Sequence, residues 1–141
     1  GIGAQMCFPV GGKTDDLHGD PIPVSGRIRT LFDGEYRHIG AYMNGQYARM
    51  GLTAVVDCGN VTIVLTEERV PPWDPGHVRF LGLFPEHFHI IVVKSALAWK
   101  TAFGDVAKLE IDVDTPGCCS ANLHRFRYEA LKRPIYPLDD M

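Results

Sequence analysis

The sequence predicts an α+β domain built on one mainly antiparallel sheet with two or three short helices; a mixed α/β arrangement is the alternative. Two patterns predict this class. The first half is rich in strand-like runs separated by turn residues, and the second half has a strand–helix–strand pattern. A length of 141 residues with 45% hydrophobic residues is enough for a real core, so residues 1–141 are expected to form a single domain.

The strand prediction is clearest in the first half. Residues 22–31 alternate with period two, which is typical of a half-buried strand. Asp33-Gly34 is a strong hairpin signal that leads into an extended segment over residues 35–38. The clearest hairpin joins the β-branched runs 53–57 and 61–66 through Cys58-Gly59-Asn60.

The middle of the chain predicts a helix followed by a buried strand. Asp74 is a good N-cap and Pro75 suits the first helical position, so a short helix is expected over residues 75–83. The apolar run 88–93 is typical of a strand that is buried on both faces.

A second helix and a last strand follow. Ser95 is expected to cap a short helix over residues 96–103, which Gly104 ends. Residues 108–113 alternate as another strand, and a short helical stretch is expected near residues 120–126.

Charge and hydropathy exclude two classes of partner. The net charge is −3, and lysine and arginine residues do not cluster. Nucleic acid and acidic membranes both require a basic face, so neither is expected to bind. No apolar run approaches the roughly 20 residues that span a bilayer, and no signal segment opens the chain. A cytoplasmic protein is therefore expected.

The stretch least like ordinary packing is the polar segment Gly11–Gly19, here called the glycine loop. It follows the apolar lead-in Met6, Phe8 and Val10. It is not a Walker phosphate loop, because Cys7 stands where that motif needs glycine and no helix follows. Its acids and histidine are open to three interpretations: contact with a ligand, ligation of a divalent metal, or satisfaction of turn amides. The candidate ligand-contacting residues of the loop are Gly11, Gly12, Lys13, Asp15 and His18.

Lys94 and Ser95 are the second pair of candidate binding residues. They lie where the predicted buried strand meets a helix, a place where α/β proteins often position binding groups. Lys94 would balance a carboxylate or a developing oxyanion. The alternative is that Lys94 is a solvated strand end and Ser95 only a helix cap.

The other histidines and the cysteines give weaker signals. His87 and His89 would share one strand face and resemble half a metal site, but no third ligand is identifiable. His38, His77 and His124 are isolated and are expected at the surface or satisfied in the core. No C-x-x-C pair is present, and the adjacent Cys118-Cys119 is interpreted as two reduced thiols rather than a metal chelate or strained disulfide.

A resemblance emerges once these residues are placed. The sequence resembles the carboxy-terminal domain of the MlrC (microcystinase C) family of metallopeptidases, and the matching segments lie in family order along essentially the whole chain. They are Val10-Gly11-Gly12-Lys13-Thr14-Asp15, His18-Gly19, Pro21, Val64-Leu65-Thr66-Glu67, Asp74-Pro75, Val92-Val93-Lys94-Ser95, Ala102-Phe103, Asp114-Thr115-Pro116-Gly117 and Arg133-Pro134-Ile135-Tyr136-Pro137-Leu138.

The resemblance implies a two-domain zinc hydrolase that acts on peptide-like substrates, as in microcystin degradation. It also implies that the zinc ligands lie in a larger amino-terminal domain, so no catalytic residue, metal ligand or cofactor is expected in this chain. The expected partners are that catalytic domain and the peptide-like substrate, with homo-oligomers open. One departure concerns the group His-Phe-Arg that follows the family's Lys-Ser, because this chain has Ala98-Trp99-Lys100 instead.

Two functions of different class follow from these observations. In the first, the chain is a non-catalytic domain, excised from a larger protein, that contributes its glycine loop to an interdomain substrate cleft. In the second, it is a small-ligand or protein-interaction module without hydrolase activity, and residues 42–50 provide its apolar surface.

Overall fold

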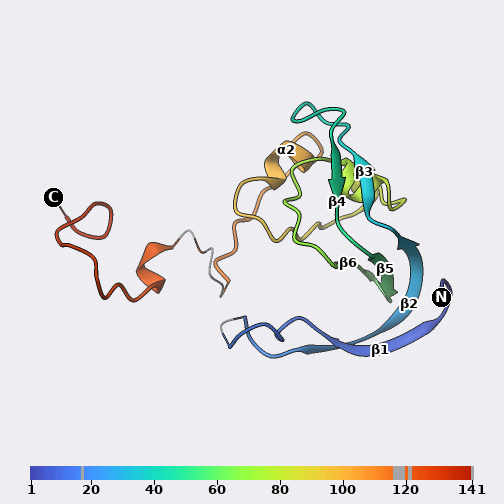
Figure 1. Ribbon diagram of the computed structural model, residues 1–141, viewed down its shortest axis with the longest axis horizontal. Coiled ribbons are helices and arrows are strands. Elements are labelled where there is room, and N and C mark those ends of the chain that lie inside the picture. The colour runs from blue at the N-terminus through green and yellow to red at the C-terminus, as the bar shows by residue number, and fades with distance from the viewer. Residues whose placement is uncertain (17, 116–119, 121, 141) are drawn as a thin grey trace.

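The computed structural model describes residues 1–16, 18–115, 120 and 122–140, and it shows two antiparallel sheets with short helices (Figure 1). The larger sheet has the strand order β1-β2-β5-β6 and the smaller one pairs β3 with β4. This arrangement confirms the predicted α+β class.

The strands are β1 Gln5–Val10, β2 Ile22–Phe32, β3 Glu35–Arg37, β4 Tyr47–Arg49, β5 Thr53–Cys58 and β6 Val61–Thr66. The helical elements are α1 Gly76–Arg79, the 3₁₀ turn η1 Pro85–His87, α2 Trp99–Phe103 and the 3₁₀ turn η2 Leu123–Arg125.

The hairpin between β5 and β6 forms as predicted. The two strands pair in antiparallel register from Thr53 opposite Thr66 to Cys58 opposite Val61. Val55 and Val56 are 0% and 1% exposed, so the β-branched residues of β5 supply the centre of the sheet. Burying such side chains favours folding by about 1.5–3 kcal/mol each.

The turn at Asp33-Gly34 forms, but the hairpin predicted around it is wrong. β2 pairs with β5, and β3 pairs with β4 in the second sheet. Gly34 has a φ of +82°, and a Cβ atom there would lie 1.9 Å from the carbonyl oxygen of Gly51. The turn therefore crosses another segment closely and passes the chain to the second sheet, instead of folding β2 back on itself.

The apolar lead-in forms a strand that the sequence pattern did not predict. β1 pairs antiparallel with β2, from Gln5 opposite Arg27 to Val10 opposite Ile22. Its side chains are mostly exposed, which is typical of an edge strand. The pairing makes the glycine loop the connection between two neighbouring strands.

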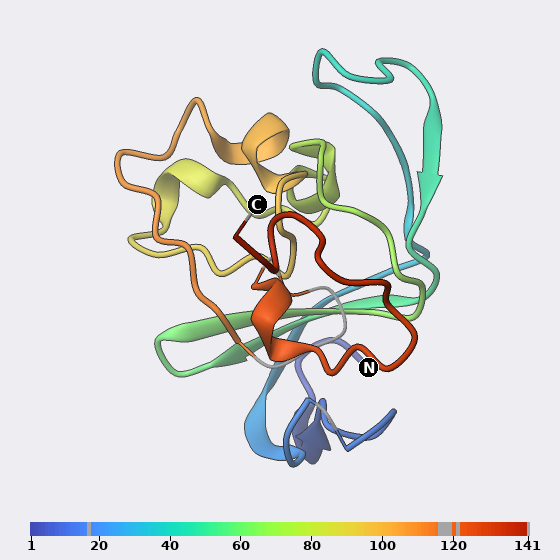
Figure 2. The same ribbon diagram turned by 90° about the vertical axis from the view of Figure 1, so that its left-hand side faces the viewer.

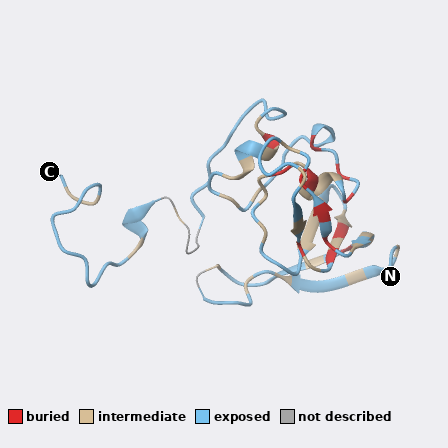
Figure 3. Cartoon of the chain, turned by 45° about the horizontal axis from the view of Figure 1, so that its top comes forward, coloured by how far each residue is buried: buried red, intermediate tan, exposed pale blue. Residues whose placement is uncertain are grey.

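The core lies between the sheets and the α1 region, where Figure 3 shows most of the buried residues. A single cluster of buried hydrophobic side chains holds strands and helices together. Its members are Tyr36, Met50, Val55, Leu81 and Leu83. The residues 122–140 are mainly exposed, and they stand apart from the sheets in Figure 1; Figure 2 looks along this part of the chain.

The helices are shorter than predicted. α1 ends at Arg79 rather than near residue 83, and its N-cap position is Pro75. The carboxylate of Asp74 nevertheless accepts a hydrogen bond from the backbone N–H of Gly76, so Asp74 does stabilise the helix start. The predicted cap at Ser95 is wrong, because α2 begins only after Ala98 and has no side-chain cap.

Two of the predicted strands, 88–93 and 108–113, do not form. Ile90 and Val92 are 80% and 91% exposed, which contradicts a strand buried on both faces. In the part of the chain that the structure describes, no backbone hydrogen bond joins either segment to a strand. A strand requires a partner for its N–H and C=O groups, and the described sheets offer none to these segments.

The remaining outcomes are local. η2 lies inside the helical stretch predicted near residues 120–126. His87 ends η1 rather than starting a strand, so the proposed half metal site of His87 and His89 loses its common strand face. The Cys118-Cys119 pair falls outside the described residues. Among the residues that are described, no helix is long and apolar enough to cross a membrane.

Candidate functional site

The two ends of the glycine loop have positive backbone φ angles, which glycine adopts without strain. Its first residues, Gly11 and Gly12, have φ values of +72° and +55°, and Gly19 near its end has +78°. A Cβ atom on Gly12 would lie 2.4 Å from the carbonyl oxygen of Gly19. The two ends of the loop therefore touch, and the exposed polar residues between them are presented as one compact unit.

Within the loop, Asp15 positions the ring of His18. Nδ1 of His18 lies 2.6 Å and 2.8 Å from the two carboxylate oxygens of Asp15. The backbone N–H of His18 also donates to Oδ1 of Asp15 over 3.2 Å. An ionised carboxylate only accepts hydrogen bonds, so Nδ1 must be the protonated nitrogen. Nε2 is then left for a ligand or a proton, which is the arrangement that orients histidines in many sites.

Lys13 packs back against the strand that leads into the loop. Its Nζ donates a 2.6 Å hydrogen bond to the carbonyl oxygen of Pro9, and its side chain is exposed. An ammonium group has three donors, and among the described residues Lys13 uses one of them. The loop thus carries one anchored cation and one oriented imidazole.

Lys94 and Ser95 lie on a different part of the domain. Lys94 is exposed and Ser95 is half-buried, with its backbone N–H donating to the carbonyl oxygen of Val93 over 2.9 Å. Among the described residues, no hydrogen bond or ion pair connects either of them to the glycine loop. Their convergence with the loop on one substrate stays a prediction.

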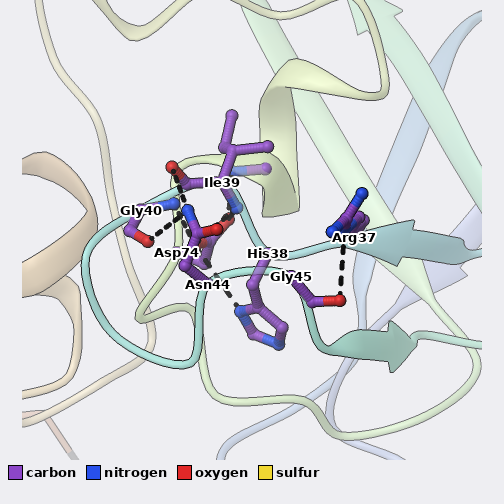
Figure 4. A network of polar contacts seen from close by, with 8 residues as sticks. Arg37, His38, Ile39, Gly40, Asn44, Gly45 and Asp74 are labelled. Atoms are coloured by element: carbon purple, nitrogen blue, oxygen red, sulfur yellow. Dashed lines mark hydrogen bonds and ion pairs between the residues drawn. The ribbon is translucent and has the colours of Figure 1, made fainter.

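A second polar centre, around Asp74, was not predicted beyond a helix cap. Asp74 is 0% exposed, and its carboxylate accepts hydrogen bonds from the backbone N–H groups of Ile39, Gly40 and Gly76 (Figure 4). The bonds from Gly40 and Gly76 are both 2.7 Å long. Asp74 therefore ties the segment after β3 to the start of α1.

Ring side chains surround this carboxylate, and several of them keep a buried polar atom without a partner. Nδ1 of His38 lies 3.6 Å from Oδ2 of Asp74, beyond hydrogen-bond distance. Among the described residues, the buried side-chain atoms without a hydrogen bond are the Tyr36 hydroxyl, His38 Nδ1, Trp73 Nε1 and His77 Nδ1. The expectation that His38 and His77 are at the surface or satisfied is thus wrong for these atoms.

Burial near Asp74 shifts two pKa values in opposite directions. Desolvation, with a smaller contribution from the Asp74 charge, raises the pKa of Tyr36 to about 12. Desolvation lowers the pKa of His77, and Asp74 opposes that change. Both shifts favour the neutral side chain of Tyr36 and of His77 beside the buried carboxylate. The signal in the sequence was the aromatic and histidine content of Tyr36-Arg37-His38 and Trp73-Asp74-Pro75-Gly76-His77.

The described residues do not form a complete metal site. Among them, no group of three or more His, Cys, Asp or Glu side chains is arranged to hold a metal ion. In the glycine loop the Asp15 carboxylate is already engaged by His18. A zinc ion is therefore not matched by the donors placed together in this part of the chain.

The residues of the apolar surface predicted over 42–50 are partly buried in the core and partly exposed to solvent. Met50 is 0% exposed and belongs to the core. Tyr42 packs edge-on against Trp73, with 5.5 Å between ring centroids, and Tyr47 is 69% exposed. An open hollow of about 400 Å³ lies elsewhere, beside the ends of β2, β5 and β6.

Comparisons with known proteins place the chain. It matches the family described as MlrC C-terminus over residues 1–130. Microcystinase C from Sphingomonas sp. is 27% identical over 139 residues, which cover 99% of this chain and 26% of that protein. A crystal structure of a candidate metallopeptidase from Mesorhizobium sp. BNC1 has a TM-score of 0.80 and 31% identity, covering 100% of this chain and 28% of that one. The chain thus spans about a quarter of each relative's length. It belongs to the MlrC C-terminus family.

Proposed function

We propose that this chain is the carboxy-terminal, non-catalytic domain of an MlrC-like zinc-dependent peptidase or amidohydrolase. In this proposal the glycine loop lines a substrate cleft formed with a larger amino-terminal domain, which holds the zinc. The family membership supports the proposal, as do the names of two relatives, Microcystinase C and a candidate metallopeptidase. Both relatives are much longer than this chain, which leaves room for such a domain.

The observation that carries the role of the loop is the pairing of Asp15 with His18. An imidazole fixed through Nδ1 presents Nε2 in one orientation, which suits a hydrogen bond to a polar group of a peptide. Lys13 adds a positive charge within the same loop, and this charge would attract a substrate carboxylate. The loop therefore offers binding groups, while the chemistry at the metal belongs to the other domain.

A second candidate is a ligand- or protein-binding module without hydrolase activity. It is favoured by two exposed tyrosines: Tyr42 in the β3–β4 connection is 52% exposed, and Tyr47 at the start of β4 is 69% exposed. Exposed aromatic side chains often anchor partners. Stabilisation of the isolated domain by a small ligand, lost in a Tyr47→Ala variant, would support this candidate over the first.

Two measurements test the proposed function. The isolated chain, supplied with zinc, is expected to show no peptide hydrolysis; robust cleavage by this chain alone would overturn the proposal. In the full-length parent, Lys13→Ala is expected to lower kcat/KM roughly tenfold, the effect of losing one charge-assisted contact. The control is Lys132→Ala, which removes an exposed lysine outside the loop. Wild-type kinetics for Lys13→Ala would remove the loop from the cleft.

A further inference from the structure

Two segments of the chain have the side-chain pattern of strands but pair with no strand among the described residues. They are residues 88–93 and 108–113, here called the two unpaired segments. Five of their large apolar side chains are at least 70% exposed, far more than a folded domain usually leaves in so short a stretch. These are Ile90 at 80%, Val92 at 91%, Leu109 at 77%, Ile111 at 75% and Val113 at 70%.

The order of apolar and polar residues in each unpaired segment indicates the kind of sheet that the segment would join. In the second segment, Leu109, Ile111 and Val113 recur every two residues, with Glu110 and Asp112 between them. That alternation describes a strand with one apolar face and one polar face. The first segment is apolar at consecutive positions from Ile90 to Val93, which is typical of a strand covered on both faces, as in parallel sheets.

A helix joins the two unpaired segments. α2 lies between them, and its last residue Phe103 is 4% exposed. Nζ of Lys100 lies 2.9 Å from Oε2 of Glu110, so α2 already contacts the second segment. A strand, a helix and a strand in this order form a unit that normally places its two strands in parallel within one sheet.

We propose that residues 88–113 form a strand–helix–strand unit whose two strands pair with a sheet in the larger amino-terminal part of the same protein. The inference rests on the proposed function, because it takes this chain as one domain of a longer parent. The contact between the two domains would then include a shared sheet, with the inter-strand main-chain hydrogen bonds that no described residue makes with segments 88–93 and 108–113.

The chemistry of the segments favours an α/β domain of the parent over a second copy of this chain. A strand that is apolar on both faces needs a sheet covered by helices, which the described part of this domain does not provide. Both relatives contain the region matching this chain within much longer chains, of which it covers 26% and 28%. In a parent of that length, a sheet of the amino-terminal part would be held near the two unpaired segments at high effective concentration.

The pairing would also explain the position of Lys94 and Ser95. They directly follow the first unpaired segment, so they would stand at the carboxyl end of a strand in the shared sheet. Ligands of open α/β sheets bind at that edge. Pairing in the shared sheet would thus place Lys94 and Ser95 at the substrate cleft.

Hydrogen exchange of the parent and of the isolated chain, measured by mass spectrometry, tests the inference. Peptides covering the two unpaired segments should exchange at least 100-fold more slowly in the parent than in the isolated chain, while peptides from β5 should be protected in both. Equally fast exchange of the two segments in both proteins would overturn the inference. Protection that appears in the isolated chain as its concentration rises would assign the sheet to a second copy and would also overturn it.

A matched pair of substitutions provides a second measurement. Ile111→Asp places a charge on the apolar face, and it should lower the Tm of the parent by roughly 5 °C or more while leaving the isolated chain unchanged. Asp112→Asn, on the polar face of the same segment, should change neither. An equal effect of Ile111→Asp on both proteins would contradict a shared sheet. These readouts do not depend on hydrolysis, so a parent without peptidase activity but with protected segments would refute the proposed function alone.

Discussion

Both carboxylate oxygens of Asp15 lie within 2.8 Å of Nδ1 of His18, in a loop closed by Gly12 against Gly19. This pair joins two of the candidate site residues side chain to side chain. It explains why a short glycine-rich connection between β1 and β2 carries acids and a histidine: the glycines close the loop, and the acid fixes the orientation of the ring.

The first prediction concerns the tautomer of His18. In the wild-type domain, the neutral ring should carry its proton on Nδ1, because the Asp15 carboxylate can only accept. Asp15→Asn should increase the population of the other tautomer, which ¹⁵N chemical shifts of the imidazole report. The control is Asp20→Asn, which changes the exposed acid directly after the loop and should leave the imidazole shifts unchanged. Identical imidazole shifts in wild type and Asp15→Asn would contradict this account of the loop.

The second prediction concerns stability. Asp74→Ala removes the acceptor of three backbone N–H groups, and it leaves the buried one of Gly76 and the partly buried ones of Ile39 and Gly40 without their partner. The free energy of unfolding should fall by about 3 kcal/mol or more, and Tm by roughly 10 °C. Asp105→Ala, at an exposed position, should change unfolding by less than about 0.5 kcal/mol. Equal effects of the two substitutions would show that the Asp74 network does not hold the fold.

The third prediction uses the raised pKa of Tyr36. Its pKa is about 12 in the fold against an ordinary value of 10.0 for tyrosine, so the unfolded chain loses this proton first as pH rises. The associated stability is present below pH 10 and is lost between pH 10 and 12, by up to roughly 3 kcal/mol. Tyr36→Phe should reduce that alkaline loss, whereas Tyr47→Phe should not, because Tyr47 is 69% exposed. Urea unfolding across this pH range measures both.

Tyr36→Phe also has an expected effect at neutral pH. The Tyr36 hydroxyl is buried and has no hydrogen-bond partner, so its removal should leave stability unchanged or slightly higher. A loss of more than about 1 kcal/mol at pH 7 would show that the hydroxyl has a partner, such as a buried water.

The elements that could be predicted from the sequence are those determined by local pattern. The β-branched runs of β5 and β6 predict their hairpin, and the alternation of residues 22–31 predicts β2. Pairing across longer distances was not predictable. The Asp33-Gly34 turn looks like a hairpin, but the close contact of Gly34 with Gly51 directs β3 to a second sheet. β1 carries too few buried side chains for a clear strand signal.

The site was predictable in part for a similar physical reason. Glycines and charged residues in one short stretch marked the loop, and its Asp15–His18 pair is local in sequence. The Asp74 centre joins residues that are 34 and 35 positions apart, so it appears only once β3 and α1 are packed together. Segments 88–93 and 108–113 were predicted as strands from their composition, yet a strand also needs a neighbour, and periodicity does not reveal where that neighbour is.

In the proposed function, the glycine loop acts in the substrate cleft of the parent enzyme. The most direct test compares kcat and KM of His18→Ala and of the control Asp20→Asn in the full-length parent, with Tm measured for both. We expect His18→Ala to lower kcat/KM roughly tenfold or more, while its Tm and the kinetics of Asp20→Asn stay at wild-type values. Wild-type kcat and KM for a folded His18→Ala variant would contradict it.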